Sequence, residues 1–98
     1  MKIKWLDATQ AVQFGESLAD YFMGRIPLPS DRKKAKSLEK QFEAVDRMYS
    51  RVEQFKVANK LNVYKKAKLT GAFKSKLIKA GYDPKLVDEV ALGIMKIL

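Results

Sequence analysis

Apolar residues recur at three- and four-residue intervals in four successive stretches of the chain. This spacing places them on one side of an α-helix, so each stretch is predicted to be an amphipathic helix. Pro27 and Pro29 end the first stretch, and Gly81 ends the third. The sequence therefore predicts an all-α fold, a compact bundle of four helices in a single domain, 1–98. The helices are expected at about 8–25, 31–58, 62–80 and 84–98.

The first predicted helix carries a row of small residues, Ala11, Gly15 and Ala19, at four-residue steps. Such a row lets a second helix approach closely. We therefore expect Gly15 to serve helix packing rather than to interrupt the helix. Asp7 is expected to be the N-cap, because its carboxylate can accept a hydrogen bond from the first helical turn.

The second predicted helix is the longest, and its apolar residues follow the alternating 3-4 spacing of a bundle seam. The predicted seam consists of Ala35, Leu38, Phe42, Val45, Tyr49 and Val52. Acidic side chains form one stripe beside this seam, and basic side chains form the next. The acidic stripe consists of Glu39, Glu43, Asp46 and Glu53, and the basic stripe of Lys33, Lys36, Lys40, Arg47 and Arg51.

Capping residues mark the starts of the last two helices. Either Asn59 or Asn62 suits the N-cap of the third helix, and a kink that joins it to the second helix is the open alternative. Asp83 followed by Pro84 predicts the start of the fourth helix. That helix is apolar over about half of its circumference, so we expect it at the centre of the core or in a subunit interface.

The third predicted helix is the most unusual part of the chain, because residues 62–81 hold six lysines and no acidic residue. On a helical wheel Lys65, Lys68, Lys76 and Lys79 fall within about 80° of one another. The formal net charge of the chain is +9, and residues 30–68, with twelve basic and five acidic residues, account for most of it. One or two helices are therefore expected to form a basic surface.

Three interpretations of this lysine-rich side are open. It can be a solvated face, partly neutralised by the acidic stripe of the second helix if the two helices form an antiparallel hairpin. It can attach to an acidic protein or to an anionic membrane surface, with Trp5 as an anchor. Packing of Trp5 over the edge of the core is the alternative for that residue. It can also bind a polyanion.

Polyanion binding is the functional hypothesis that the sequence favours. Lysine is a compact, strongly hydrated charge that suits phosphate contact, so a nucleic-acid backbone bound with low sequence specificity is the nominal ligand. The four bases near the start of the second helix oppose its macrodipole, so local stability does not explain them. The expected contacts are Arg32, Lys33, Lys34, Lys36, Lys65, Lys68, Lys76 and Lys79.

The rival hypothesis is a structural or adaptor protein whose lysines only solvate the surface. It would self-associate or dock a protein partner through the apolar fourth helix. The expected interface residues are Leu92, Ile94, Met95 and Leu98.

The chain has no cysteine and no histidine, which excludes disulfides, thiolate nucleophiles, imidazole bases and the usual zinc sites. It also lacks a Gly-rich phosphate loop and an Asp-rich calcium loop. We therefore predict a non-enzymatic protein without a cofactor or metal. No signal peptide is apparent, and no apolar run approaches the roughly 18–20 residues of a membrane span, so a cytoplasmic location is expected.

Overall fold

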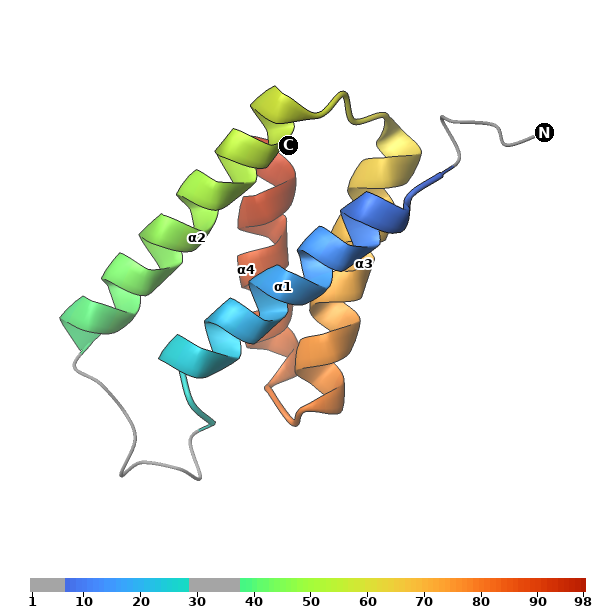
Figure 1. Ribbon diagram of the computed structural model, residues 1–98. Coiled ribbons are helices and arrows are strands. Elements are labelled where there is room, and N and C mark those ends of the chain that lie inside the picture. The colour runs from blue at the N-terminus through green and yellow to red at the C-terminus, as the bar shows by residue number, and fades with distance from the viewer. Residues whose placement is uncertain (1–6, 29–37) are drawn as a thin grey trace.

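Four helices make up the computed structural model, which describes residues 7–28 and 38–98 (Figure 1). They are α1 (Thr9–Arg25), α2 (Leu38–Ala58), α3 (Val63–Lys79) and α4 (Pro84–Ile97). The described residues contain no strand. The predicted all-α bundle of four helices is confirmed. The predicted start of the second helix, at residue 31, lies outside the described residues.

The helix ends follow the capping chemistry of the sequence, with one correction. Asn62 caps α3 by accepting a hydrogen bond from the backbone N–H of Lys65 at 2.8 Å, so α2 and α3 are separate helices. Asp83 caps α4 in the same way. The prediction for α1 is wrong by one residue, because Ala8 is the N-cap. Asp7 instead accepts from the backbone and hydroxyl of Thr9, a local turn that holds its carboxylate outside the helix.

The turn between α3 and α4 depends on Gly81, whose φ of 103° lies in the left-handed region that favours glycine. The backbone N–H groups of Gly81 and Tyr82 donate to the carbonyls of Ile78 and Leu77, which completes a Schellman motif. The hydroxyl of Tyr82 also donates to the carbonyl of Ile26, just after α1. The turn is thereby attached to the end of α1.

Each helix packs against two neighbours, in the order α1, α3, α4, α2 around the bundle (Figure 1). In the described chain, no Cα atom of α2 lies within 8 Å of one in α3. The antiparallel hairpin of the second and third helices, which the sequence left open, is therefore not formed, and the two helices lie on a diagonal. The small-residue row of α1 explains the arrangement, because it lets α3 pack closely on α1 at Gly15.

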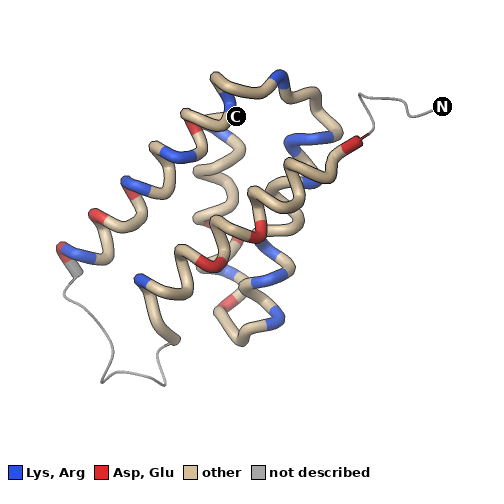
Figure 2. The backbone as a smooth tube through the Cα atoms, viewed as in Figure 1, with Lys and Arg blue, Asp and Glu red and all other residues tan. Residues whose placement is uncertain are grey.

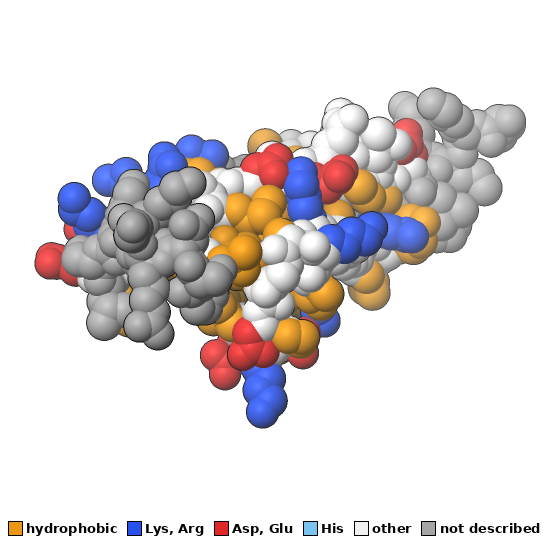
Figure 3. Space-filling view, turned by 90° about the horizontal axis from the view of Figure 1, so that it is seen from below, with side chains coloured by type: hydrophobic (Ala, Val, Ile, Leu, Met, Phe, Trp, Pro, Cys, Tyr) orange, Lys and Arg blue, Asp and Glu red, His pale blue; other side chains and the backbone are white. Residues whose placement is uncertain are grey.

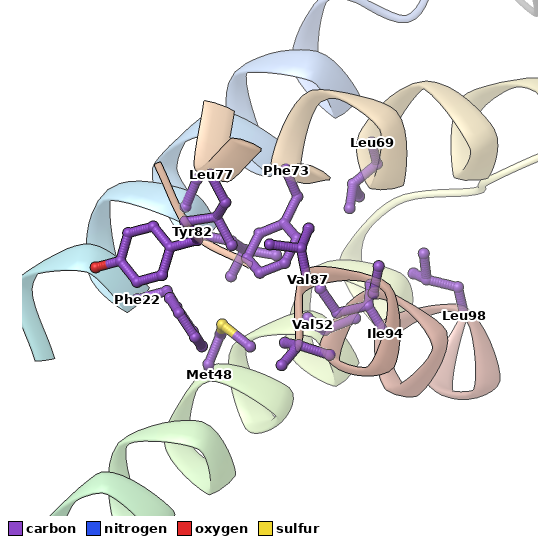
Figure 4. Packing of buried hydrophobic residues seen from close by; sticks show 14 of the residues in the cluster. Phe22, Met48, Val52, Leu69, Phe73, Leu77, Tyr82, Val87, Ile94 and Leu98 are labelled. Carbon is purple, nitrogen blue, oxygen red and sulfur yellow. The ribbon is translucent and has the colours of Figure 1, made fainter. Parts of the chain in front are cut away.

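The core takes side chains from all four helices (Figure 4). Phe22 of α1 meets Phe73 of α3 and Tyr82 edge to face, with ring centroids 6.1 and 5.6 Å apart. Edge-to-face contacts suit the aromatic quadrupole and add to the apolar burial. The largest fully buried side chains are Phe73, Leu18, Met48, Leu69, Leu77, Ile94, Val52 and Val87.

The predicted seam of α2 is wrong in part, because the buried side of the helix is centred on Met48. Val52 is buried as expected, and Val45 and Tyr49 pack at the edge of the core. Phe42, however, is 68% exposed. The residues of α2 that are buried between α1 and α4 instead follow a four-residue spacing, Ala44, Met48 and Val52.

No described helix is long and apolar enough to cross a membrane.

Candidate polyanion-binding surface

The excess positive charge of the described helices lies on α3, which carries six lysines and no acidic residue. Helix α2 carries four basic and four acidic residues, and α4 two of each. Figure 2 shows this contrast, with red on α1, α2 and α4 but only blue on α3. Because α3 is diagonal to α2, the acidic stripe of α2 does not neutralise it.

Two lysines of α3 form ion pairs with the helices that pack against α3, namely α1 and α4. The Nζ of Lys76 lies 2.8 Å from Oδ1 of Asp20 on α1, and the Nζ of Lys74 lies 2.9 Å from Oδ1 of Asp88 on α4. The hydrogen bond to Asp20 raises the pKa of Lys76. Figure 3 shows lysine side chains directly beside carboxylates on this face, with hydrophobic side chains around them. The expected polyanion contact at Lys76 is therefore already occupied by an internal partner.

The other three expected lysines of α3 have no such partner. Among residues 7–28 and 38–98, no ion pair joins Lys65, Lys68 or Lys79 to an acidic group. Lys68 and Lys79 are exposed, and Lys65 is half-buried. The Nζ of Lys68 lies 5.5 Å from the ring centroid of Tyr64, a distance at which a cation is attracted to the aromatic face. These three side chains are the open cations among the expected contacts of α3. Lys66, which is half-buried, has no ion pair in the described chain either.

A shallow depression of about 540 Å³ lies beside Lys68, where α3 meets α1. Its volume falls in the range of about 300–1,000 Å³ that is common for ligand sites, although it is open to solvent. The absence of a side chain at Gly71 helps to form it, since nothing lies within 4 Å of a Cβ built there. It is lined by Val12, Tyr64, Ala67, Lys68, Gly71 and Ala72. The signal for it in the sequence is the set of small residues that follows Tyr64: Ala67, Gly71 and Ala72.

The remaining expected site residues fall into two groups. Arg32, Lys33, Lys34 and Lys36 lie outside the described residues. On α4, Ile94 and Leu98 are 0% and 7% exposed and belong to the core, whereas Leu92 and Met95 are 57% and 42% exposed. The apolar side of α4 is thus mainly covered by its own chain, and Leu92 and Met95 remain at the surface.

The described part of the chain contains no group of three or more acidic, cysteine or histidine side chains that is arranged to hold a metal ion. Glu16 and Asp20 of α1 are exposed, and Asp20 is the partner of Lys76. The carboxylates of α2 that the structure describes are exposed as well.

The chain matches no protein-family model, and no curated protein or solved structure is detectably similar to it. Its function therefore has to be argued from its own residues.

Proposed function

We propose that this protein is a small, non-catalytic interaction module that binds a polyanion through α3. The nominal ligand is a nucleic-acid backbone, bound with little sequence preference. The observation that carries the proposal is the diagonal placement of α3 relative to α2, which leaves Lys65, Lys68 and Lys79 without acidic partners. Lysine contacts phosphate as a point charge, so an all-lysine surface favours backbone over base contacts.

Tyr64 supports a contact to single strands in particular. Its ring is 39% exposed and stands beside Lys68 at the edge of the depression on α3. An exposed aromatic ring next to a cation can stack one base while the cation contacts the adjacent phosphate. This arrangement offers one stacking position, which fits low sequence specificity.

The proposal is tested by fluorescence anisotropy with labelled single- and double-stranded oligonucleotides at several salt concentrations. Three open lysines predict that log K on duplex falls with log salt with a slope of about −3, because each neutralised phosphate contributes about −0.9. Lys68→Gln/Lys79→Gln is expected to weaken binding and to flatten the slope.

The matched control is Lys85→Gln/Lys96→Gln, which removes the same charge from exposed positions of α4. It is expected to leave binding almost unchanged. Equal weakening by both double variants would mean that only the net charge matters, and no binding at low salt would overturn the proposal.

A second candidate function is the docking of a protein partner, or of a second copy, through α4. It is favoured by the exposure of Leu92 and Met95, which lie three residues apart on one side of the helix. If this function is correct, Leu92→Asp lowers the mass of the particle in solution or abolishes partner binding, without unfolding the protein. A monomer in both the parent protein and the variant, at high concentration, would contradict self-association.

A further inference from the structure

Three of the four arginines of the chain gather around one tyrosine where α1 and α2 meet. The Cζ atoms of Arg25 and Arg51 lie 4.9 and 4.3 Å from the ring centroid of Tyr21. Arg47, one helical turn before Arg51, lines a cleft with Tyr21 and Arg25. The chain uses sixteen lysines and only four arginines, so the abundance of arginine does not account for this cluster.

The packing of α1 on α2 creates the cluster. Phe14 of α1 stacks on Phe55 of α2, with ring centroids 4.1 Å apart and planes 7° apart. Because the two helices run in opposite directions from this contact, the end of α1 reaches the middle of α2. Arg25 lies at the C-terminal end of α1, where the helix dipole stabilises a positive charge. Arg47 and Arg51 lie inside α2, so the dipole of α2 does not explain their positions.

The cluster has more positive than negative charge. In the described parts of the chain, no ion pair joins Arg25, Arg47 or Arg51 to an acidic group. Lys40 and Glu43 also line the cleft, and Arg51 stands next to it on Tyr21, so even without Lys40 three guanidinium groups face one carboxylate. A concave surface with this excess charge raises the local concentration of anions.

The chemistry of guanidinium groups indicates which anion fits. A guanidinium group that stacks on an aromatic ring uses its flat face and keeps the N–H donors in its plane free. Those donors form paired hydrogen bonds with phosphate oxygens. The cleft measures about 140 Å³, which is below the range of about 300–1,000 Å³ for sites of whole small molecules. It therefore suits one phosphate group rather than a complete nucleotide.

We propose that Arg25 and Arg47, which line the cleft between α1 and α2, form a binding site for a phosphate monoester together with Arg51 on the adjoining ring of Tyr21. This site is separate from the surface proposed on α3 and does not rest on it. Glu16 and Asp20 are exposed on α1. Figure 2 shows red on α1 between the blue of α2 and the blue of α3. An anion that follows α3 would have to cross these carboxylates to reach the arginines.

The test is a titration of the protein with inorganic phosphate and with glycerol phosphate, a monoester, observed through the Nε–Hε signals of arginine in NMR spectra. The chain has four such signals, one from each arginine. We expect the signals of Arg25, Arg47 and Arg51 to shift together along one saturable curve. Sodium chloride at the same ionic strength should not reproduce that curve. Tighter binding of the monoester would show that the natural phosphate is carried on a larger molecule, and equal binding would point to free phosphate.

Variants separate this site from the charge of the whole protein. Arg47 lines the cleft without touching the tyrosine ring in the way that Arg25 and Arg51 do, so Arg47→Gln is expected to leave the fold intact. It should weaken phosphate binding about tenfold, the loss of one strong charge-assisted hydrogen bond. Lys96→Gln, with the same change in charge, should not weaken it. Lys68→Gln/Lys79→Gln should also leave it unchanged, which keeps the two proposals distinguishable.

The proposal is overturned if all four arginine signals drift without saturation, since this is the behaviour of a diffuse ion atmosphere. It is also overturned if Arg47→Gln and Lys96→Gln weaken binding equally. Tyr21→Leu gives a second check that does not alter charge. It should weaken phosphate binding and make the Nε–Hε signals of Arg25 and Arg51 shift less. The reason is that the guanidinium groups of these two residues lose the ring surface that orients them.

Discussion

The backbone carbonyl of Leu69 on α3 occupies the space in which a side chain on Gly15 of α1 would begin. The carbonyl carbon of Leu69 lies 3.1 Å, and the Cβ of Ala72 lies 3.2 Å, from the position of a Cβ on Gly15. Backbone atoms cannot rotate out of the way as a long side chain can. The close packing of α1 on α3 therefore requires that residue 15 has no side chain. The same packing brings Lys76 of α3 next to Asp20 of α1.

Gly15→Ala is expected to destabilise the protein although alanine favours helices. The added methyl group forces α1 and α3 apart, and overpacking of this kind costs about 1–3 kcal/mol. The free energy of unfolding, measured in urea, should fall by that amount. An unchanged or increased stability would contradict the close approach of the two helices.

Gly71→Ala is the matched variant and is expected to act in the opposite direction. Gly71 lies inside α3 with nothing within 4 Å of an added Cβ. Replacing an unhindered glycine inside a helix by alanine stabilises by about 0.5–1 kcal/mol, mainly because the unfolded chain loses freedom. If Gly15→Ala and Gly71→Ala change the urea midpoint in the same direction, helix propensity rather than packing controls both positions.

Gly93 and Tyr49 form a similar contact between α4 and α2, but the obstructing atoms belong to a side chain. The Cζ atom of Tyr49 lies 2.8 Å from the position of a Cβ on Gly93, and the hydroxyl group donates to the carbonyl of Val90 at 3.3 Å. Gly93→Ala should displace the ring and destabilise the protein. Tyr49→Leu shortens the side chain, so it should relieve the clash in the double variant.

A double-mutant cycle measures this relation. The two changes are expected to be non-additive by about 0.5–3 kcal/mol, the range for residues in contact. Additive changes in the free energy of unfolding would show that the ring of Tyr49 does not cover Gly93.

Local sequence patterns were sufficient to predict the four helices and most of the core. The caps at Asn62 and Asp83, the turn at Gly81 and the buried side of α1 all follow from residues within a few positions of one another. The spacing of apolar residues identifies a buried side without reference to the partner helix. For this reason the element boundaries of the described chain agree closely with the predicted ones.

The neighbours of each helix were not predictable in the same way. The sequence left open whether α3 lies beside α2, and in the structure α3 packs on α1 instead. The pairing of Lys76 with Asp20 depends on this long-range contact. The heptad spacing of α2 separately misidentified part of its buried side. The row of small residues that includes Gly15 contained the correct signal, but the spacing alone did not say which helix would approach it. The arginine cluster around Tyr21 depends on the same long-range packing.

Stability is expected to fall at alkaline pH because of Tyr82. Burial raises the pKa of this phenol, as it does for Tyr49, above the usual value of 10.0. Between pH 10 and the raised pKa, the unfolded chain loses the phenolic proton while the folded chain keeps it. Unfolding then releases a proton, so the free energy of unfolding decreases as the pH rises through this interval.

Tyr82→Phe tests this assignment. It should lower stability at neutral pH by about 1 kcal/mol, through loss of the hydrogen bond to the carbonyl of Ile26. In Tyr82→Phe the free energy of unfolding should also decrease less steeply with rising alkaline pH. In the double variant Tyr49→Phe/Tyr82→Phe this decrease should be smaller still. The measurement is urea unfolding at a series of pH values up to the alkaline limit. An alkaline decrease as steep as in the parent protein would assign the effect to other groups.

The pairing of Lys76 with Asp20 predicts that loss of one carboxylate will strengthen polyanion binding. Asp20→Asn removes the partner that lies 2.8 Å from the ammonium group, so Lys76 becomes a further open cation on α3. The slope of log K against log salt on duplex should steepen by about 0.9, the contribution of one further phosphate contact. Glu89→Gln is the matched control, since it makes the same change in charge at an exposed position of α4. A steeper slope for Asp20→Asn alone supports binding along α3 at defined lysines. Equal changes in both variants would instead mean that the ligand responds to net charge, and the assignment of α3 as the binding surface would be wrong.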